Sequence, residues 1–400
     1  MKRRMHLLPF AVFLFILPFP GTVTLRLSAL AAGSMVCAWT LHKDGFPHVP
    51  ARAAILLWVA CALLSLVAAV DPGYSLGEIK NEIGYAMATY LGFLTLTRTR
   101  ADAGFFAIAL ILGALVLAAL ASWEYFSATS TMWNERGLAG GSGSYSTYLL
   151  ALMPALLWAG CTLAHRHRWS VISGLIALQL VIAVWAGQRA FWPVFALQAL
   201  IALYLLRARG FIAIPVPRLR AIGVAAVILS ALAVVGATAK RNTIPLSQDR
   251  RLAIWPAVAA RILEHPLVGK GFGREVMKKA YPELVSKKYP EVWHAHNLFL
   301  NYGMSMGIPG MIALLLLFLA LLREFWRLSK ADERMTAMAG ICGVLLVIGV
   351  IARNLTNDFF QRDLALLFWT IAGMLLGYAT HATADPKPQE CQPGRKHACS

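Results

Sequence analysis

Charged residues are scarce in this chain of 400 residues. Asp, Glu, Lys and Arg together make up 14% of it, whereas hydrophobic residues make up 58%. Soluble globular domains carry about 25% charged residues, so this composition excludes an ordinary soluble protein. The scarcity leaves no room for a separate soluble catalytic domain, and any chemistry is expected in the membrane or in the loops.

Patterns that hold metals, cofactors or disulfides are also missing. The six cysteines lie in apolar segments or in the tail, and none has metal-ligand spacing, so neither a zinc site nor a disulfide framework is expected. No D-x-D pair occurs in the segments assigned below to the outer face, which argues against a divalent metal. The glycine-rich stretch RGLAGGSGS (136–144) lacks the G-x-x-x-x-G-K-[ST] pattern of a nucleotide site. We therefore expect no metal, no cofactor and no nucleic-acid partner.

Apolar blocks of about 20 residues, the length that spans a bilayer core, recur along the chain. The candidate spans are 6–20, 22–41, 53–70, 78–97, 104–122, 145–164, 169–187, 190–206, 221–238, 296–322, 335–352 and 363–380. The sequence therefore predicts an all-α integral membrane protein with about 12 transmembrane helices. Residues 1–380 are expected to form one polytopic domain that includes a long loop with helices, 239–295. The polar residues 381–400 are expected to be a disordered cytoplasmic tail.

The distribution of basic residues orients these spans. With the N-terminus in the cytoplasm, most basic residues of the short loops fall on the cytoplasmic side, including Arg166, Arg168, Arg207 and Arg209. Cytoplasmic loops carry an excess of Lys and Arg, so both termini are predicted to be cytoplasmic. The first apolar segment follows MKRRMH but has no cleavage pattern before the next span, and we interpret it as a retained helix.

The long outer loop breaks this charge rule. Residues 239–292 hold eleven Lys and Arg against five Asp and Glu, although basic residues resist placement outside. An anionic partner would explain the excess: a phosphate, an acidic glycan or lipid headgroups. A solvated amphipathic helix pair is the alternative. Trp255, Val258 and Ile262 recur at helical spacing, and this apolar face is expected to lie on the membrane or on the bundle.

Several residues that could carry chemistry fall on the same outer face. They are Arg136, Tyr145, Tyr148, Arg189, Arg250, Arg251, His294, His296, Asn297, Arg353 and Asp358. Charges near membrane depth are expensive and are often functional. Arg189 has apolar neighbours on both sides, and it either snorkels to lipid phosphates or offers a planar donor fork to a phosphate or diphosphate.

The two histidines of WHAHN (293–297) have two interpretations each. His296 is either a structural interfacial histidine or a general base, because an unperturbed imidazole titrates near neutral pH. His294 and His296 are two residues apart, so on a helix they point in different directions, and at most one is expected to be the base. Asn297 could cap the following helix or orient a sugar.

The motifs that hold these residues resemble the O-antigen ligase/polymerase superfamily. HAHNLFLNYGMSMGIPG (294–310) looks like its His-Asn-x-x-Leu…Gly-x-x-Gly signature, and RLAIWPAVAARILEHPLVGKGFG (251–273) looks like its Arg-x-x-x-Trp…His-Pro-Leu-x-Gly-x-Gly segment. RGLAGGSGSYSTYLLALMPALLW (136–158) resembles a third stretch, with serine and tyrosine where asparagines are usual. The likeness covers about residues 130–375, keeps the order of the motifs and includes the arginine turn AGQRAFWP.

The resemblance implies a metal-independent, inverting glycosyltransferase of the GT-C type in the bacterial inner membrane. Such a ligase transfers a glycan from undecaprenyl diphosphate to lipid A–core oligosaccharide on the periplasmic face. It implies His296 as general base and Arg189 and Arg251 as the groups that stabilise the leaving diphosphate. The residues expected to bind substrate, for Arg353 and Asp358 from their position alone, are Arg136, Tyr145, Tyr148, Arg250, His294, Asn297, Arg353 and Asp358.

Two rival functions stay open. A polymerase of the same superfamily would use another undecaprenyl-linked glycan as acceptor, although the length and the single dominant outer loop look most like the ligase. A transporter would instead place ionisable residues at mid-membrane, whereas here, apart from Arg26 and Glu82, they cluster at the ends of the spans.

Overall fold

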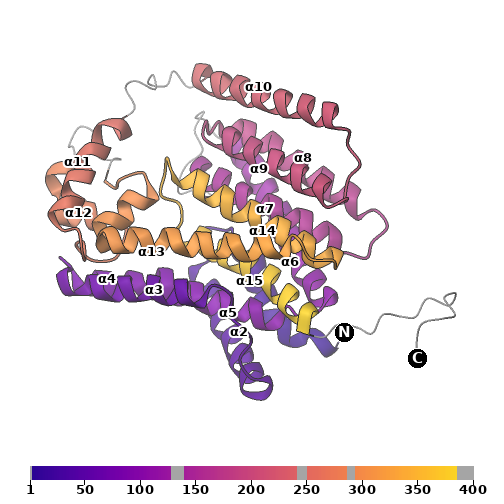
Figure 1. Ribbon diagram of the computed structural model, residues 1–400, viewed down its shortest axis with the longest axis horizontal. Helices are drawn as coiled ribbons and strands as arrows, with labels where there is room; N and C mark the ends of the chain where they lie inside the picture. The colour runs from indigo at the N-terminus through magenta and orange to yellow at the C-terminus, as the bar shows by residue number, and fades with distance from the viewer. Residues whose placement is uncertain (1, 128–138, 241–249, 286–292, 385–400) are drawn as a thin grey trace.

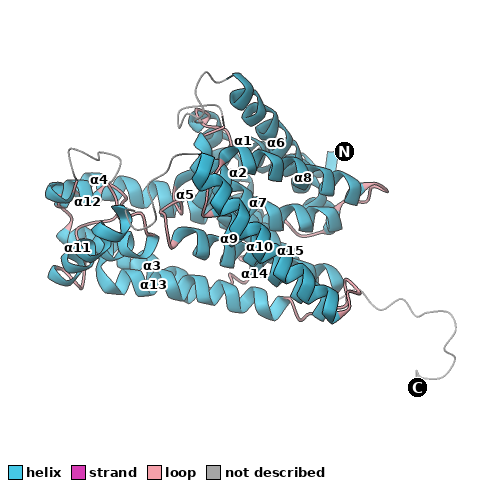
Figure 2. Cartoon of the chain, turned by 90° about the horizontal axis from the view of Figure 1, so that it is seen from above, coloured by secondary structure: helices cyan, strands magenta, loops and turns pink. Residues whose placement is uncertain are grey.

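The computed structural model describes residues 2–127, 139–240, 250–285 and 293–384, and all regular elements among them are helical (Figures 1 and 2). The helices are α1 (Leu8–Ile16), α2 (Val23–Asp44), α3 (Arg52–Leu64), α4 (Pro72–Glu78), α5 (Tyr85–Leu96), α6 (Arg100–Ser127), α7 (Gly141–Thr162), α8 (Arg168–Ala186), α9 (Phe191–Ala208), α10 (Val216–Lys240), α11 (Arg250–Glu264), α12 (Val276–Ala280), α13 (Leu298–Leu328), α14 (Arg334–Asn354) and α15 (Arg362–Ala384). A π-helical turn, Ile79–Gly84, joins α4 to α5.

The prediction of an all-helical chain is confirmed. Each of the predicted spans coincides with a helix, and 53–70 and 78–97 each add a short helical turn. Within the described ranges, eight helices are long and apolar enough to cross a membrane: α2, α6, α8, α9, α10, α13, α14 and α15. Two shorter apolar helices are Arg4–Ile16 and Arg52–Ala68. The count of twelve crossings stays a prediction.

The helices differ sharply in how much of their surface is inside the protein. Within the most apolar 18-residue stretch of each helix, 78% of the residues are buried in α14 and 83% in α15, whereas only 6% are buried in α10. α15 packs on α5 and α14, and α14 also packs on α7 and α13. α10 lies along the outside of the bundle against α9 (Figure 1). Any lipid-facing surface is therefore concentrated on α2 and α8 to α10, and α14 and α15 form the interior.

Helix α13 is broken at Gly307, where φ is +71° and ψ is −173°. A side chain there would place its Cβ 2.5 Å from the Pro266 carbonyl oxygen, so only glycine fits. The loop 265–273 docks at this break through its backbone. The Ile308 N–H donates to Pro266 O (2.7 Å), and the Lys270 N–H donates to Met304 O (2.9 Å). Among the loop glycines, Gly269 provides clearance toward α13, where a Cβ would lie 2.5 Å from Ser305, whereas Gly273 provides clearance toward Tyr74 of α4.

The long outer loop packs its apolar residues on α13. Ile254, Val258 and Ile262 from α11 form a small cluster with Met277, Tyr281, Ala295 and Met304, separate from the main core. The Trp255 indole N–H donates to Ala295 O at 2.9 Å. The predicted apolar face of this segment is therefore confirmed, and it lies on the helix bundle.

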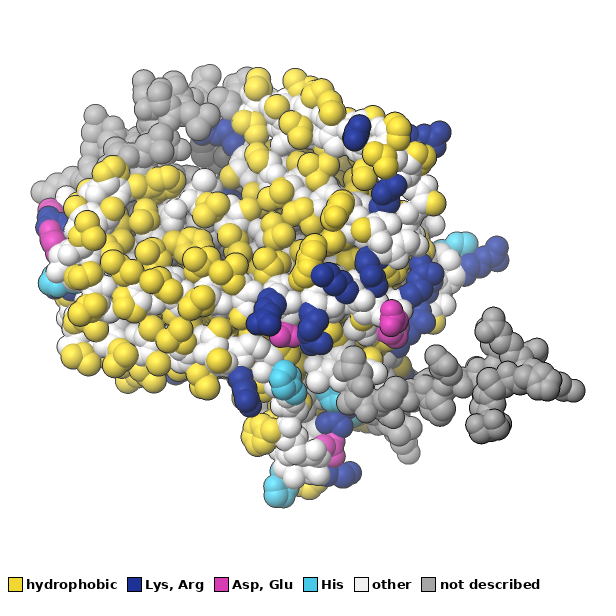
Figure 3. All heavy atoms as spheres, viewed as in Figure 1, with side chains coloured by type: hydrophobic (Ala, Val, Ile, Leu, Met, Phe, Trp, Pro, Cys, Tyr) yellow, Lys and Arg dark blue, Asp and Glu magenta, His cyan; other side chains and the backbone are white. Residues whose placement is uncertain are grey.

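The two ends of the bundle carry different side chains. Lys and Arg gather at the end where α9 and α13 finish and α14 begins, and hydrophobic side chains cover the flank beside them (Figure 3). The start of α7, the turn before α9, residues 293–297 before α13 and the loop that precedes α15 lie together near the other end of the bundle. The segments predicted to share the outer face thus lie together in space.

Candidate functional site

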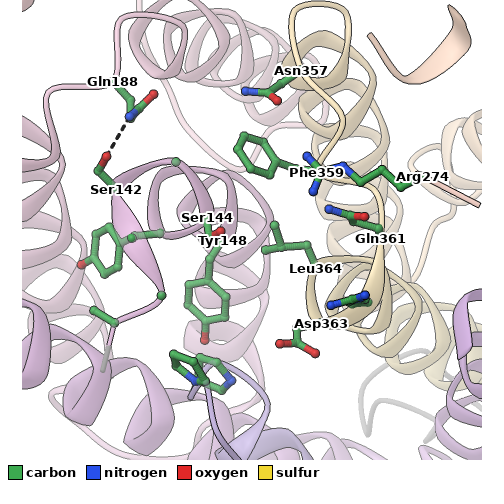
Figure 4. A pocket seen from close by; sticks show the side chains of 18 of the residues that line it. Ser142, Ser144, Tyr148, Gln188, Arg274, Asn357, Phe359, Gln361, Asp363 and Leu364 are labelled. Atoms are coloured by element: carbon green, nitrogen blue, oxygen red, sulfur yellow. Dashed lines mark hydrogen bonds between the residues drawn. The ribbon is translucent and has the colours of Figure 1, made fainter. Parts of the chain in front are cut away.

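A cavity of about 930 Å³ lies at the end of the bundle that carries α11 and α12. Its walls come from seven separate parts of the chain: the segment after α1, Leu117 of α6, the start of α7, Gln188, Arg274, the segment 293–296 that holds the two histidines, and the segment 357–364 at the start of α15. Figure 4 shows the α7 side chains facing those of the α15 segment across this space. The cavity is large enough for sugar residues together with a diphosphate.

One side of the cavity, here named the charged wall, consists of Arg274, His294, His296 and Arg362. Arg274 is its centre. Its Nη2 lies 2.8 Å from His294 Nε2, its Nε lies 3.4 Å from Asp358 Oδ2, and its guanidinium lies over the Trp293 ring at 4.7 Å. The side-chain amide of Gln361 is oriented with its oxygen toward Arg274, because only this orientation pairs the oxygen with a donor. The oxygen then accepts from Arg274 Nη1 at 2.5 Å. The planar donor fork is therefore fixed in direction before any substrate binds.

Asp358 supports Arg274 from behind the charged wall. The carboxylate is 2% exposed and accepts a hydrogen bond from Asn301 Nδ2 at 3.0 Å. Burial raises the pKa of Asp358 to about 6, against the opposing effect of the Arg274 guanidinium. Burial also lowers the pKa of Arg274 from its ordinary value, and Asp358 opposes that decrease. Each group thus offsets part of the desolvation cost of the other.

The two histidines have different surroundings. His294 is buried, with Arg274 Nη2 at its Nε2 and the His296 backbone N–H donating to its Nδ1 at 3.1 Å. A neutral imidazole has one acceptor nitrogen and one N–H, so the tautomer of His294 decides which of these two contacts is a full hydrogen bond. His296 lines the cavity, is half-buried, and has the positive φ of +49°. Such a backbone is uncommon for a residue other than glycine and is often found at functional sites.

The start of α13 fixes the position of this histidine pair. Asn297 is the N-cap, its Oδ1 accepts from the Leu300 N–H at 3.1 Å, and its Nδ2 donates to Leu355 O at 2.8 Å. The predicted capping role of Asn297 is confirmed. The same side chain ties the helix start to the loop that carries Asp358, so the histidines and the carboxylate hold a constant spacing.

A second charge pair closes the floor of the cavity. Arg26 is buried, and its Nη1 lies 2.5 Å from Asp363 Oδ1 and donates to Leu17 O at 3.2 Å. Asp363 and Arg362 both line the cavity, and Arg362 has φ of +43°. Arg26 was one of the two ionisable residues predicted to lie away from the ends of the spans. Its contact with Asp363 connects α2 to the start of α15.

The opposite side, named the hydroxyl wall, consists of Ser142, Ser144, Tyr145 and Tyr148 at the start of α7. The Tyr145 hydroxyl donates to Gln179 Oε1, and Gln188 Nε2 donates to Ser142 Oγ at 2.8 Å (Figure 4). These side chains are uncharged donors and acceptors. They suit neutral hydroxyl-rich ligands, whereas the charged wall suits an anion.

Other predicted site residues lie outside the cavity wall. Gln188 lines the cavity where Arg189 was expected, and Arg189 is half-buried in the same turn. Arg353 is buried, donates from Nε to Thr147 Oγ1 at 3.1 Å and lies over the Phe359 ring at 5.0 Å. Arg136 and the side chains of Arg250 and Arg251 lie outside the described residues. The structure therefore brings together Tyr145, Tyr148, His294 and His296, with Asp358 behind them.

Arg274 is the residue that sequence reasoning missed. It follows the last glycine of HPLVGKGFG and is one of eleven basic residues in its loop. The available signal was its position, because an arginine directly after a Gly-x-Gly turn that packs on a helix is held in a defined direction. Gln361 offered no comparable pattern. Among the described side chains, no group of three or more His, Cys, Asp or Glu is placed to hold a metal ion.

Comparison with known proteins confirms the resemblance read from the motifs. Residues 155–315 match the model of the O-antigen ligase family, a range that contains Gln188, Arg274, His294 and His296. A protein of Rickettsia conorii named "Putative polysaccharide ligase" is 30% identical over 115 residues. That alignment covers 27% of this chain and 28% of the relative. The matched range thus includes three of the four residues of the charged wall, Arg274, His294 and His296.

Proposed function

We propose that this chain is an inverting GT-C type glycosyltransferase of the bacterial inner membrane that acts as an O-antigen ligase. It transfers a glycan from undecaprenyl diphosphate to a sugar hydroxyl of lipid A–core oligosaccharide on the periplasmic face, without a metal. The observation that carries the proposal is the cavity in which a fixed arginine fork and a histidine face a wall of hydroxyl groups, within and beside the matched family region.

In the proposed reaction the acceptor hydroxyl oxygen attacks the anomeric carbon of the donor. A new glycosidic C–O bond forms while the bond between that carbon and the diphosphate oxygen breaks, and the electron pair leaves with the diphosphate. His296 takes the proton of the acceptor hydroxyl as general base. Its position in the cavity wall and its strained backbone support this role. One displacement inverts the configuration at the anomeric carbon.

The charged wall would stabilise the leaving group. Arg274 and Arg362 line the cavity and are placed to meet the growing negative charge on the diphosphate. The roles of Arg189 and Arg251 as diphosphate ligands remain part of the proposal, with Arg189 in the turn next to Gln188. Arg353 holds Thr147 and Phe359 in place, so its proposed effect on substrate binding acts through these two neighbours.

The test is a transfer assay with purified full-length protein, lipid A–core, undecaprenyl diphosphate-linked glycan and excess chelator. Wild type is compared with His296→Ala and with a matched control, His265→Ala, which changes an exposed histidine of the same loop. Loss of a general base typically costs on the order of 10²–10⁴ in rate. We expect that loss for His296→Ala, with His265→Ala close to wild type and both variants folded by size-exclusion chromatography.

The products separate the proposal from its rivals. Glycan joined to core in the presence of chelator supports the ligase. Lengthened undecaprenyl-linked glycan with no transfer to core identifies a polymerase, and full activity of His296→Ala removes the base assignment. If wild type is active only without chelator, the metal-independent mechanism is wrong.

A further inference from the structure

A second cavity, of about 590 Å³, lies at the basic end of the bundle. Three arginines line it: Arg100, Arg168 and Arg334. The remaining lining is almost entirely apolar, and includes Leu157, Met338 and Ile341 with the aromatic rings of Trp169 and Phe211. A cavity with cations at its rim and hydrocarbon along its walls has the two-part character of an amphiphile site.

The three arginines are positioned by the helices they begin. Arg100, Arg168 and Arg334 are the first residues of α6, α8 and α14, so three positive helix N-termini point to the same region. Arg100 Nη2 donates to Cys161 O at 2.8 Å, and Arg168 Nη1 donates to Leu163 O at 2.8 Å. These contacts use backbone carbonyls, which leave the positive charges without neutralisation.

The nearby carboxylates are already engaged with the backbone. Asp102 accepts from the Thr99 N–H at 3.0 Å, and Glu333 accepts from the N–H groups of Met335 and Thr336 as the N-cap of α14. Arg334 lies over the Phe211 ring at 5.0 Å. Neither carboxylate lines the cavity, so within the part of the chain that the structure describes the charged side chains of its lining are the three arginines alone.

We propose that this cavity binds an anionic phospholipid, with the phosphate at the three arginines and an acyl chain along the apolar wall. Basic pockets between membrane helices bind anionic lipid headgroups in this way. Free phosphate would match the rim alone and leave the apolar wall exposed, whereas a phospholipid matches both parts. The two sites are far apart, because Tyr148 and Cys161 lie on α7 with 13 helical positions between them, about 20 Å. The proposal stands independently of the glycosyltransferase function.

The test is native mass spectrometry of the full-length protein in detergent. The protein is incubated with equal amounts of phosphatidylglycerol and phosphatidylcholine that share the same acyl chains. Each arginine near a charged lipid surface favours the anionic lipid by roughly a factor of five, so we expect phosphatidylglycerol to be retained at least tenfold over phosphatidylcholine. Equal retention of the two lipids by wild type would overturn the proposal without any variant.

Two variants and one matched control locate the lipid. The triple variant Arg100→Gln/Arg168→Gln/Arg334→Gln should lose the preference. The control Arg323→Gln/Arg327→Gln/Lys330→Gln removes the same charge from exposed residues of the same end and should keep it. Ile212→Trp keeps every charge but fills the cavity, and it should also reduce retention of phosphatidylglycerol. Retained preference in the triple variant, or an equal loss in the control, contradicts the assignment.

A further arm separates a lipid from a free anion. Excess inorganic phosphate is added at constant ionic strength, with chloride as the reference. A phospholipid held by both rim and wall stays bound, and loss of the lipid to phosphate alone would show that the site recognises a free anion instead.

Discussion

The two walls of the outer cavity are assembled differently. The hydroxyl wall comes from one continuous stretch at the start of α7, and its side chains bond to neighbouring helices one at a time. The charged wall and its support come from distant parts of the chain, because Arg274 contacts His294 within the wall and Asp358 behind it. Removing one member therefore leaves a buried charge uncompensated. We infer that damage spreads through the charged wall and stays local in the hydroxyl wall.

Arg274→Met is expected to have the largest effect on activity of the substitutions that compare the two walls. It removes the arginine fork and leaves Asp358 buried without its cation. We expect transfer activity to fall on the order of 10²–10³-fold, as for loss of one preorganised donor, with a lowered Tm. Arg274→Lys keeps the charge but loses the fork, so it should restore Tm more than kcat. Restoration of full kcat by lysine would show that only the charge matters.

The pH dependence of stability tests the partner carboxylate. Because burial raises the pKa of Asp358 to about 6, the folded protein keeps this proton between about pH 4 and pH 6, where an unfolded aspartate has lost it. The unfolded state then binds fewer protons, so this contribution to stability falls as pH rises through that window and is constant above it. Across this pH window the contribution of Asp358 to the free energy of unfolding changes by at most about 3 kcal/mol.

The measurement is Tm in detergent from pH 4 to pH 7 for wild type and Asp358→Asn. The variant has no such proton, so its Tm relative to wild type should rise between pH 4 and pH 6. Glu283→Gln removes an exposed carboxylate and serves as the control for lost negative charge. Parallel curves for Asp358→Asn and wild type would contradict a raised pKa.

The hydroxyl wall should show the smallest change. Tyr145→Phe removes one hydrogen bond to Gln179, worth about 1 kcal/mol. If this wall holds neutral sugar, KM should rise a few-fold with kcat unchanged. A fall in kcat as large as that of Arg274→Met would erase the distinction between the two walls.

Local patterns in the sequence predicted much of this structure. Apolar runs located the helices, and the loop order placed His294, His296, Tyr145 and Tyr148 on one face, because both signals depend on residues near each other in the chain. Asn297 was identifiable as a cap for the same reason.

The remaining features depend on contacts between distant segments. Arg274 and Asp358 are in contact although 84 positions separate them in the chain, and Arg26 and Asp363 are in contact although 337 positions separate them. No local sequence pattern encodes either pair. The turn 187–190 was found, but hydropathy does not determine which of Gln188 and Arg189 faces the cavity. The break in α13 lies inside an apolar run, and only docking of the loop on Gly307 reveals it.

That break also sets a depth. The 31 residues of α13 would extend about 46 Å, well beyond a hydrocarbon layer of about 30 Å, and the part from Ile308 to Leu328 can fill that layer alone. The part from Leu298 to Met306, which follows His296 and lies beyond the break, is then left outside the hydrocarbon layer. Under the proposed function, a sugar acceptor would reach His296 from the aqueous side, whereas a polyprenyl-linked donor would have to rise out of the hydrocarbon to meet it.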